Sequence, residues 1–523
     1  MKYKTKDIQL TVDEFHNKSH QQIVAEFLKI KKDALSNVSV FKKSVDARRK
    51  NNVHYVVSFV FETKLNLDKN KNITQMPVQT DFFDNIVQKQ SDKKVLVVGS
   101  GSAGLFCALY LAKSGLKPIL IEQGKAVEQR QTDIDKLWLD GVLNCDSNVQ
   151  FGLGGAGTFS DGKLTTSAHN QYVYSVFSQF VKYGAPSEIL TEAMPHVGTD
   201  NLKIVVTNIA NDIQKLGGTV LFDTKLVDFK NQNGKNIAVL QNNGQLKQVE
   251  TDYIILAVGH SARDTFKVLY DNGMNISQKP FSVGVRIEHD REVINCARYG
   301  KNYDKRLPTA TYKLATHLPN GRSVYTFCMC PGGQVVLSCS EKDTIVTNGM
   351  SFFARDERNS NSALLVNVLP SDFGSDHPLA GVEFQRKIER SAYQLTGSYS
   401  APCQKVEDFL QGKKSTDYGN LKPSIRPAPT PSNLADCLPD FVFKSLQQAL
   451  PQFAKSIEGF DKNAILTGVE TRSSSPIKLN RDENFATNLP NILVCGEGSG
   501  YAGGIVTAAV DGLKCAIKLT ESI

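Results

Sequence analysis

The sequence predicts an α/β protein with a parallel-sheet domain, a β-rich domain inserted into it, and a small α+β module in front. Residues 94–98 form an apolar run that is followed by glycines, a small-residue helix and a second apolar run, the order of a strand–turn–helix–strand unit. A glycine cluster and a helix of the same kind return in residues 491–523. Between residues 280 and 480, apolar and polar residues alternate between Gly, Pro and Asn turns, a pattern typical of β-strands. We therefore expect domains at residues 1–90, 91–280 and 281–480, with residues 481–523 returning to the parallel-sheet domain.

The first part is predicted to be an α+β module with a ferredoxin-like shape. Residues 7–12, 38–45 and 53–62 have strand-like patterns, and residues 19–33 have the apolar stripe of a helix. This βαββ order suggests the ferredoxin-like shape. Because the first cysteine of the chain is Cys107, the module cannot hold an iron–sulfur cluster through its own thiolates.

Most of the net charge of +8 lies in this module, since residues 1–71 hold 15 Lys/Arg and 8 Asp/Glu. A basic segment can contact nucleic acid or an acidic partner. Its basic and aromatic residues do not interleave as they do in nucleic-acid-binding proteins. We therefore favour a solvated, lysine-rich surface over a nucleic-acid site.

Composition places the chain among cytoplasmic proteins rather than membrane or secreted ones. No apolar run approaches the roughly 18 residues of a membrane span, and no apolar segment of a signal peptide follows the first lysines. The ten cysteines are scattered without metal-type CxxC pairs, which fits a reducing compartment better than a disulfide framework. We expect no metal site.

The glycine turn at residues 99–104 is the strongest motif in the chain, and it predicts an ADP-containing dinucleotide. Gly99 permits the tight turn, Gly101 lets the backbone approach a pyrophosphate, and Gly104 lets the helix pack against the strand. The diphosphate would lie at the helix N-terminus, beside Ser102 and Ala103. Glu122 follows the second apolar run at the spacing of the ribose-binding carboxylate, which disfavours NADP.

Three more glycine clusters favour a flavin dinucleotide over a nicotinamide one. Residues 151–164 hold many glycines in a short stretch, which can bring main chain against a flat polar ligand. A second cluster ends a buried strand at Gly259, and a third covers residues 496–504 before a small-residue helix that begins at Ile505. The N-terminus of that helix could stabilise negative charge on a reduced flavin ring.

In these stretches the chain resembles the FAD-dependent dehydrogenases of bacteria and plastids, a family of the glutathione-reductase-like flavoprotein superfamily with largely unassigned substrates. The matching stretches are residues 151–164, 327–333, 347–351, 470–476 and 496–512. The resemblance implies FAD as cofactor, with Glu122, Gln123 and Gly124 at the adenosine ribose and Arg130 near the pyrophosphate. It also implies Gly496 and Glu497 along the ribityl chain, and Gly503 and Gly504 beneath the pyrimidine. Leu153 departs from the acidic residue expected at its position, so it receives no role.

The residues predicted to bind the cofactor are Gly99, Gly101, Ser102, Ala103, Gly104, Glu122, Gln123, Arg130, Gly154, Gly155, Ala156, Gly157, Ser160, Gly259, Gly496, Glu497, Gly503, Gly504 and Ile505.

Lys163, Arg472 and Cys330 are the candidates for chemistry. Arg472 is flanked by hydroxyl residues and could hold a carboxylate or phosphate, or it could complete an internal turn. Lys163 could offset charge on a reduced flavin or donate a proton, or it could be a surface lysine.

Cys328 and Cys330 are expected on one face of a hairpin formed by residues 323–330 and 334–340. They could be a redox dithiol, although we favour two small buried side chains. His260 and Arg263 follow a strand end and are weaker candidates.

The predicted function is that of an FAD-dependent oxidoreductase that transfers a hydride through flavin N5 to or from a small organic substrate, for which an acidic group is one option. Because one complete dinucleotide fingerprint is present, the electrons would come from a visiting NAD(P)H, a redox partner protein or the substrate. The alternatives are a flavin-dependent RNA-modifying enzyme that uses the basic N-terminal module, and a flavoprotein whose FAD is structural.

Overall fold

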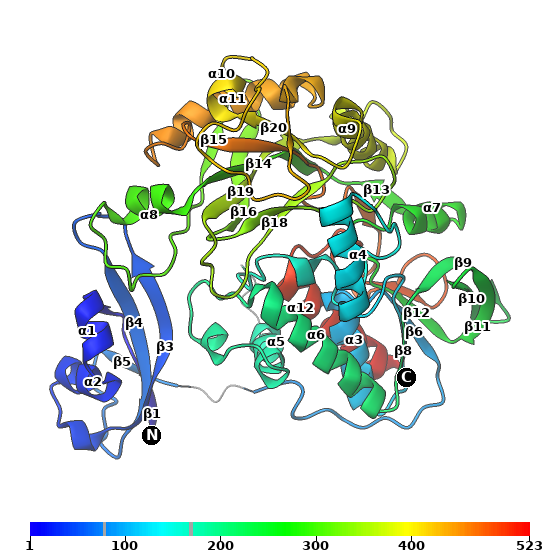
Figure 1. Ribbon diagram of the computed structural model, residues 1–523. Helices are drawn as coiled ribbons and strands as arrows, with labels where there is room; N and C mark the ends of the chain where they lie inside the picture. Colours follow the sequence, from blue (N-terminus) through cyan, green and yellow to red (C-terminus); the bar gives the residue numbers. More distant parts are fainter. Residues whose placement is uncertain (77–79, 167–170) are drawn as a thin grey trace.

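The computed structural model describes residues 1–76, 80–166 and 171–523. Figure 1 shows the N-terminal module in blue on one side, the parallel-sheet domain with its helices, and the β-rich domain next to both. No described helix combines the length and the hydropathy that a bilayer crossing requires.

The N-terminal module is an antiparallel sheet with two short helices. Its elements are β1 (Lys2–Thr5), β2 (Ile8–Leu10), α1 (Val12–Asn17), α2 (His20–Leu28), η1 (Lys32–Ala34), β3 (Ser36–Asp46), β4 (His54–Glu62) and β5 (Ile73–Gln75). β4 pairs with β3 and with both β1 and β2, while β1 also pairs with β5. If β1 and β2 count as one interrupted strand, this is a ferredoxin-like sheet without a helix between β4 and β5.

The predicted βαββ order of this module was incomplete. It lacked the short strands β1 and β5, whose sequences are too brief to show a period of two. The predicted helix over residues 19–33 ends at Leu28, because Lys29 adopts a left-handed conformation with φ of 56°. The module packs on the rest of the chain through a shared apolar core, and an Asp13–Arg306 ion pair of 2.5 Å spans the contact.

The parallel-sheet domain has the strand order β24-β12-β6-β7-β8, with every neighbouring pair parallel. Its elements are β6 (Val95–Val98), α3 (Ser102–Lys113), β7 (Ile119–Ile121), α4 (Val127–Asp140), η2 (Gly155–Phe159), α5 (Gln171–Lys182), η3 (Ser187–Leu190), α6 (Gly198–Lys215), β8 (Thr219–Leu221), β9 (Thr224–Gln232), β10 (Lys235–Asn242), β11 (Gln245–Thr251), β12 (Tyr253–Leu256), α7 (Arg263–Asp271), β24 (Ile492–Val494) and α12 (Ile505–Ser522).

Two apolar layers hold this sheet. Val95 and Val97 face the helices α3, α6 and α12, whereas Leu96 and Val98 face the small sheet of β9, β10 and β11. The alternation follows from the period of two along a strand. β24 comes from the end of the chain and pairs with β12, so the C-terminal segment returns to the first sheet (Figure 1).

In the β-rich domain, the described strands form a seven-stranded sheet in the order β15-β16-β19-β14-β22-β20-β21. The elements are β13 (Ile276–Gln278), β14 (Phe281–Asp290), α8 (Arg291–Tyr299), β15 (Ala315–His317), β16 (Ser323–Cys330), β17 (Gln334–Leu337), β18 (Thr347–Met350), β19 (Asn359–Val368), η4 (Pro370–Asp372), α9 (Ala380–Thr396), β20 (Pro402–Lys405), α10 (Val406–Leu410), β21 (Thr430–Pro431), η5 (Leu434–Asp436), α11 (Asp440–Ala454), β22 (Ile465–Glu470) and β23 (Ile477–Leu479). The predicted α/β fold class, with its parallel sheet and β-rich insertion, is confirmed.

The predicted hairpin of residues 323–330 and 334–340 was wrong. β16 pairs with β15 and β19, and β17 pairs with β18 instead. The chain changes direction because β16 leaves regular register between Phe327 and Cys330. Gly332 then turns sharply, with φ of 49° and no room for a side chain beside the Arg355 carbonyl.

Candidate functional site

A cavity of about 950 Å³ lies between the parallel-sheet domain and the β-rich domain. This volume is at the upper end of the range of about 300–1,000 Å³ found for cofactor and small-molecule sites. One wall consists of the glycine-rich turns, and the other comes from residues 311–314, 326–329 and 470–474. The predicted site residues on its walls are Gly99, Gly101, Ser102, Ala103, Glu122, Gln123, Gly154, Gly155, Ala156, Gly157, Ser160, Lys163, Gly259, Arg472, Glu497, Gly503, Gly504 and Ile505.

The first glycine turn is built as the motif predicts. Gly99 has φ of 100°, and a Cβ there would lie 2.5 Å from the Ala257 carbonyl oxygen. A Cβ at Gly104 would lie 1.8 Å from the Gly99 oxygen, so these two glycines are required by packing. Helix α3 then starts without a side-chain cap, with Gly101 at its N-cap position. Its first N–H groups border the cavity, where they can bind an anion.

Other glycines keep the cavity itself open. A Cβ at Gly101 would meet only the Gly155 Cα atom, at 4.0 Å, and one at Gly259, Gly503 or Gly504 would meet nothing within 4 Å. The protein therefore has room for side chains at these four positions. Because all four line the cavity, such side chains would occupy the space of a ligand, which is the fit expected of a site for a large flat cofactor.

Glu122 lies at the predicted place, but its carboxylate is already engaged. One oxygen accepts from the backbone and hydroxyl of Ser100, at 2.9 and 2.8 Å. The other accepts from the N–H groups of Gly124 and Gly152, at 3.0 and 2.9 Å. A carboxylate offers about four lone-pair sites, so Glu122 ties three turns together while it borders the cavity.

Arg130 is fully buried and does not line the cavity. Its guanidinium donates to the carbonyls of Asn148, Val149, Leu153 and Gly155 at 2.8–2.9 Å. Burial lowers the pKa of Arg130 to about 9. The arginine predicted near the pyrophosphate thus fixes the loop that forms the cavity wall.

Gly104 and Gly496 also lie behind the wall. A Cβ at Gly496 would lie 2.7 Å from the Ala103 Cβ atom, and its N–H donates to Asp511 at 2.8 Å. Gly496 therefore allows the returning segment to pack against the first turn of α3.

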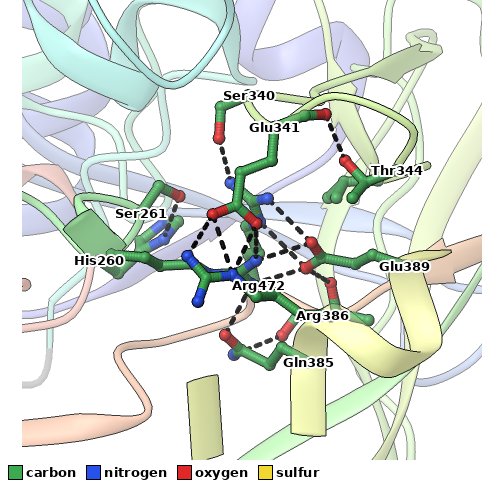
Figure 2. A network of polar contacts seen from close by, with 12 residues as sticks. His260, Ser261, Ser340, Glu341, Thr344, Gln385, Arg386, Glu389 and Arg472 are labelled. Atoms are coloured by element: carbon green, nitrogen blue, oxygen red, sulfur yellow. Dashed lines mark hydrogen bonds and ion pairs between the residues drawn. The ribbon is translucent and has the colours of Figure 1, made fainter. Parts of the chain in front are cut away.

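Arg472 borders the cavity, yet its guanidinium belongs to the buried ion network in Figure 2. Glu389 bonds Arg472 at 2.9 and 3.1 Å and Arg263 at 2.7 and 2.8 Å. Ser340 accepts from the other end of Arg472 at 2.5 Å. Burial raises the pKa of Glu389, but the two guanidiniums outweigh it and hold that pKa well below its ordinary value. This geometry favours a structural role for Arg472 over anion binding.

Lys163 has a partly exposed side chain and lies 4.0 Å from the Asp161 carboxylate. Asp161 itself is buried and bonds Ser351 and Arg355. Burial raises the pKa of Asp161, but Lys163 and Arg355 lower it below the ordinary value. The Lys163 ammonium is therefore available to a ligand in the cavity.

The structure gives the two cysteines different exposures. Cys328 lines the cavity, whereas Cys330 is buried behind it. Arg286 donates to the carbonyl of Cys328 at 2.9 Å and to the sulfur of Cys330 at 3.5 Å. The predicted common strand face is absent because β16 is irregular at this point.

Two carboxyl groups and one histidine on the cavity wall have perturbed pKa values. Burial raises the pKa of Glu497 to about 7, against the effect of the Gly504 N–H and Lys279. Burial also raises the pKa of Glu470, opposed by its 3.1 Å ion pair with Arg286. Burial and the nearby Arg472 and Arg263 lower the pKa of His260 to about 3. Sequence reasoning missed Glu470, whose only signal was its place at the start of the 470–476 motif.

No cluster of three metal-ligating side chains occurs in the part of the chain that the structure describes. The features of the site are its glycine wall, its helix N-termini and its ionisable side chains.

Comparisons with known protein families match nearly the whole chain. Residues 93–277 match the model of the pyridine nucleotide-disulphide oxidoreductases, and residues 280–473 match that of the FAD-dependent protein, C-terminal domain-like. Residues 2–62 match a domain of unknown function.

A protein of Clostridium beijerinckii, named "Uncharacterized protein", is 42% identical over 535 residues, which cover 100% of this chain and 99% of that protein. Solved structures with a distant likeness include aklavinone-11 hydroxylase with FAD and aklavinone, with TM-score 0.35, 14% identity, and coverage of 83% of this chain and 63% of that one. Another is a flavoprotein/dehydrogenase from Cytophaga hutchinsonii, with TM-score 0.36, 13% identity, and coverage of 82% and 79%.

The two family models cover the walls of the cavity up to residue 473, and the relative covers the chain from end to end. The chain binds FAD and belongs, with its relative from Clostridium beijerinckii, to the family of FAD-dependent oxidoreductases.

Proposed function

We propose that this oxidoreductase transfers a hydride between its flavin and a small organic substrate that enters the cavity on the side of the β-rich domain. The observation that carries the proposal is a single cavity with two different walls. Open glycines line one wall, with Lys163 and Glu497 beside them, and the other wall carries Glu470 and Arg472. FAD supplies a two-electron acceptor and donor at N5.

The chain's own residues would hold the cofactor along the glycine wall. The free N–H groups at the start of α3 face the place for the pyrophosphate. Gln123, beside Glu122, would meet the adenosine ribose, and Gly503 and Gly504 would lie beneath the flavin pyrimidine at the start of α12.

Lys163 and Glu497 are the residues we propose for the chemistry. The Lys163 ammonium would hold an acidic group of the substrate or offset negative charge that develops in the cavity. Glu497, with its pKa raised to about 7, can exchange a proton at its carboxyl oxygen near neutral pH. We assign Arg472 to positioning, because Glu389 and Ser340 occupy its guanidinium.

NAD(P)H is the electron donor we favour, since the model that matches residues 93–277 is named for pyridine nucleotides. A redox partner protein is the alternative. We place the enzyme in a reducing compartment such as the cytoplasm, in keeping with its ten free cysteines.

The test is an anaerobic titration of the purified yellow protein with NADH and with NADPH, followed by flavin absorbance. Bleaching by one nucleotide, slowed when its transferable C4 hydrogen is replaced by deuterium, supports hydride transfer. If neither nucleotide bleaches the flavin while dithionite does, NAD(P)H is excluded as the donor. K163Q should slow bleaching, whereas K182Q, on the exposed side of α5, should not.

A further inference from the structure

Cys328 and Cys330 are the reactive groups of the cavity that the proposed function leaves unused. A strand rises about 3.3–3.4 Å per residue, so residues two apart on a regular strand lie near the upper limit of about 6.8 Å for disulfide-linked Cα atoms. β16 is not regular here, because its pairing with β19 shifts between Phe327 and Cys330, and Cys328 has φ of 43°. The bulge brings the Cys330 sulfur to 3.3 Å from the Cys328 carbonyl oxygen.

The two thiols differ in access. Cys328 is partly exposed and lines the cavity, whereas Cys330 is fully buried. The Cys330 thiol donates to the Cys328 carbonyl at 3.3 Å, so it is held against its neighbour. This is the arrangement of an attacking thiol at the surface with a resolving thiol beneath it.

Two cations lie beside the pair, each next to a carboxylate: Arg286 pairs with Glu470 at 3.1 Å, and Lys163 lies 4.0 Å from Asp161. The Arg286 guanidinium contacts the Cys330 sulfur and the Cys328 carbonyl, and Lys163 adds a second cation. The neighbouring Cys330 side chain, followed by the charges of Lys163 and Arg286, outweighs the effect of burial and lowers the pKa of Cys328 below its ordinary value. Cys328 therefore has the thiolate character that exchange with a disulfide requires.

Other cysteines of the chain lack these features. Cys339 and Cys403 are buried, and burial raises their pKa values to about 12. Cys107, Cys495 and Cys515 contact one another in the core between α3 and α12. None of these five lines the cavity.

We propose that Cys328 and Cys330 form a redox-active dithiol on the cavity wall that exchanges two electrons with a low-molecular-weight disulfide. The Cys328 thiolate attacks one sulfur of the small disulfide, forms a mixed disulfide and releases one thiol. The Cys330 sulfur then attacks Cys328, forms the Cys328–Cys330 bond and releases the second thiol. The protein loses two electrons and two protons, and the small disulfide is reduced to two thiols. This activity does not depend on the proposed hydride transfer.

The test is to incubate the reduced holoprotein anaerobically with oxidised glutathione, alkylate the remaining thiols and map the peptides by mass spectrometry. We expect the peptide with Cys328 and Cys330 to escape alkylation and to be about 2 Da lighter, because two hydrogens leave. C330S should stop at the mixed disulfide of Cys328 with glutathione, and C328S should form neither product. C339S is the matched control and should behave as the wild type.

The proposal is overturned if Cys328 and Cys330 stay fully alkylated in oxidised glutathione, or if the disulfide maps to Cys107, Cys495 or Cys515. The readout is the mass of a peptide rather than turnover, so it is independent of flavin bleaching by NAD(P)H. Either proposal can therefore fail while the other stands.

Discussion

Replacement of Glu389 by glutamine tests the buried ion network between the two domains (Figure 2). Glu389 on α9 is fully buried and accepts five hydrogen bonds, from Arg263 on α7, from Thr471 and from Arg472. E389Q removes the charge and turns one acceptor into a donor that faces guanidinium N–H groups. Two buried cations then lose their common partner.

The expected loss of stability depends on the hydrogen-bond partners that each arginine keeps. Removal of one partner from a buried ion pair costs about 3–5 kcal/mol. Arg263 keeps Glu341 at 2.8 Å and Arg472 keeps Ser340 at 2.5 Å, so we expect about 3 kcal/mol. With a urea m-value of about 3 kcal/mol per M, the unfolding midpoint would fall by about 1 M.

The assay is urea unfolding followed by the fluorescence of Trp138, the single tryptophan of the chain. Its indole donates to the Leu337 carbonyl at 3.0 Å, so it reports the contact between α4 and the β-rich domain. The control is E383Q on the same helix, since Glu383 is 62% exposed and forms a surface ion pair with Arg386. Such a surface pair contributes about 0–1 kcal/mol.

Acid should remove the contribution of this ion network to the stability of the protein. The folded-state pKa of Glu389 is depressed, so its contribution is present above the ordinary Glu pKa of about 4.3 and is lost as the pH falls. The gap between wild type and E389Q should narrow in acid. A midpoint for E389Q within about 0.3 M of the wild type at neutral pH would refute the reasoning, since it corresponds to about 1 kcal/mol or less.

Three further predictions concern the cavity. G101A should leave the melting temperature of the FAD-free protein unchanged, because its Cβ meets only a 4.0 Å contact. The same variant should weaken FAD binding more than tenfold in a flavin fluorescence titration. A wild-type Kd would contradict the claim that FAD lies against Gly101. R130M should lower the melting temperature by several degrees and release FAD, since it deletes four hydrogen bonds to the 148–155 loop. An unchanged flavin content would contradict the role of Arg130 in holding this loop. The pKa of Glu497 in the folded protein is raised to about 7, so the stability of the protein should fall as the pH rises from about 4.3 to 7. Thermal melts of E497Q should show a weaker fall over this range. Identical pH profiles for E497Q and the wild type would contradict the raised pKa.

The glycine spacing was sufficient to predict the turn that borders one side of the cavity. Gly99, Gly101 and Gly104 lie in consecutive turns of one short segment, so local geometry alone fixes their roles. The return of a glycine motif near residue 500 likewise predicted that the end of the chain rejoins the first sheet. Such features depend on residues that are neighbours in the sequence, so a sequence pattern can indicate them.

The side-chain partners could not be predicted in the same way. Glu122 accepts hydrogen bonds from Ser100, Gly124 and Gly152, and Arg130 donates to carbonyls of the 148–155 loop, so both side chains are held by protein groups. The predicted hairpin around residue 331 was wrong because β16 pairs with β19, which is far along the chain. Long-range pairing depends on which strands the fold brings together, and no local pattern records it.

The sequence by itself determined the dinucleotide turn and the α/β class, because these depend on residue type and short spacing, and its resemblance to a flavoprotein family implied FAD. Only the tertiary structure decided that Glu389 occupies Arg472 and that Lys163 and Arg286 lie beside Cys328. These contacts join residues more than 40 positions apart, and a charge acts on whatever is near it in space, however distant it is along the chain.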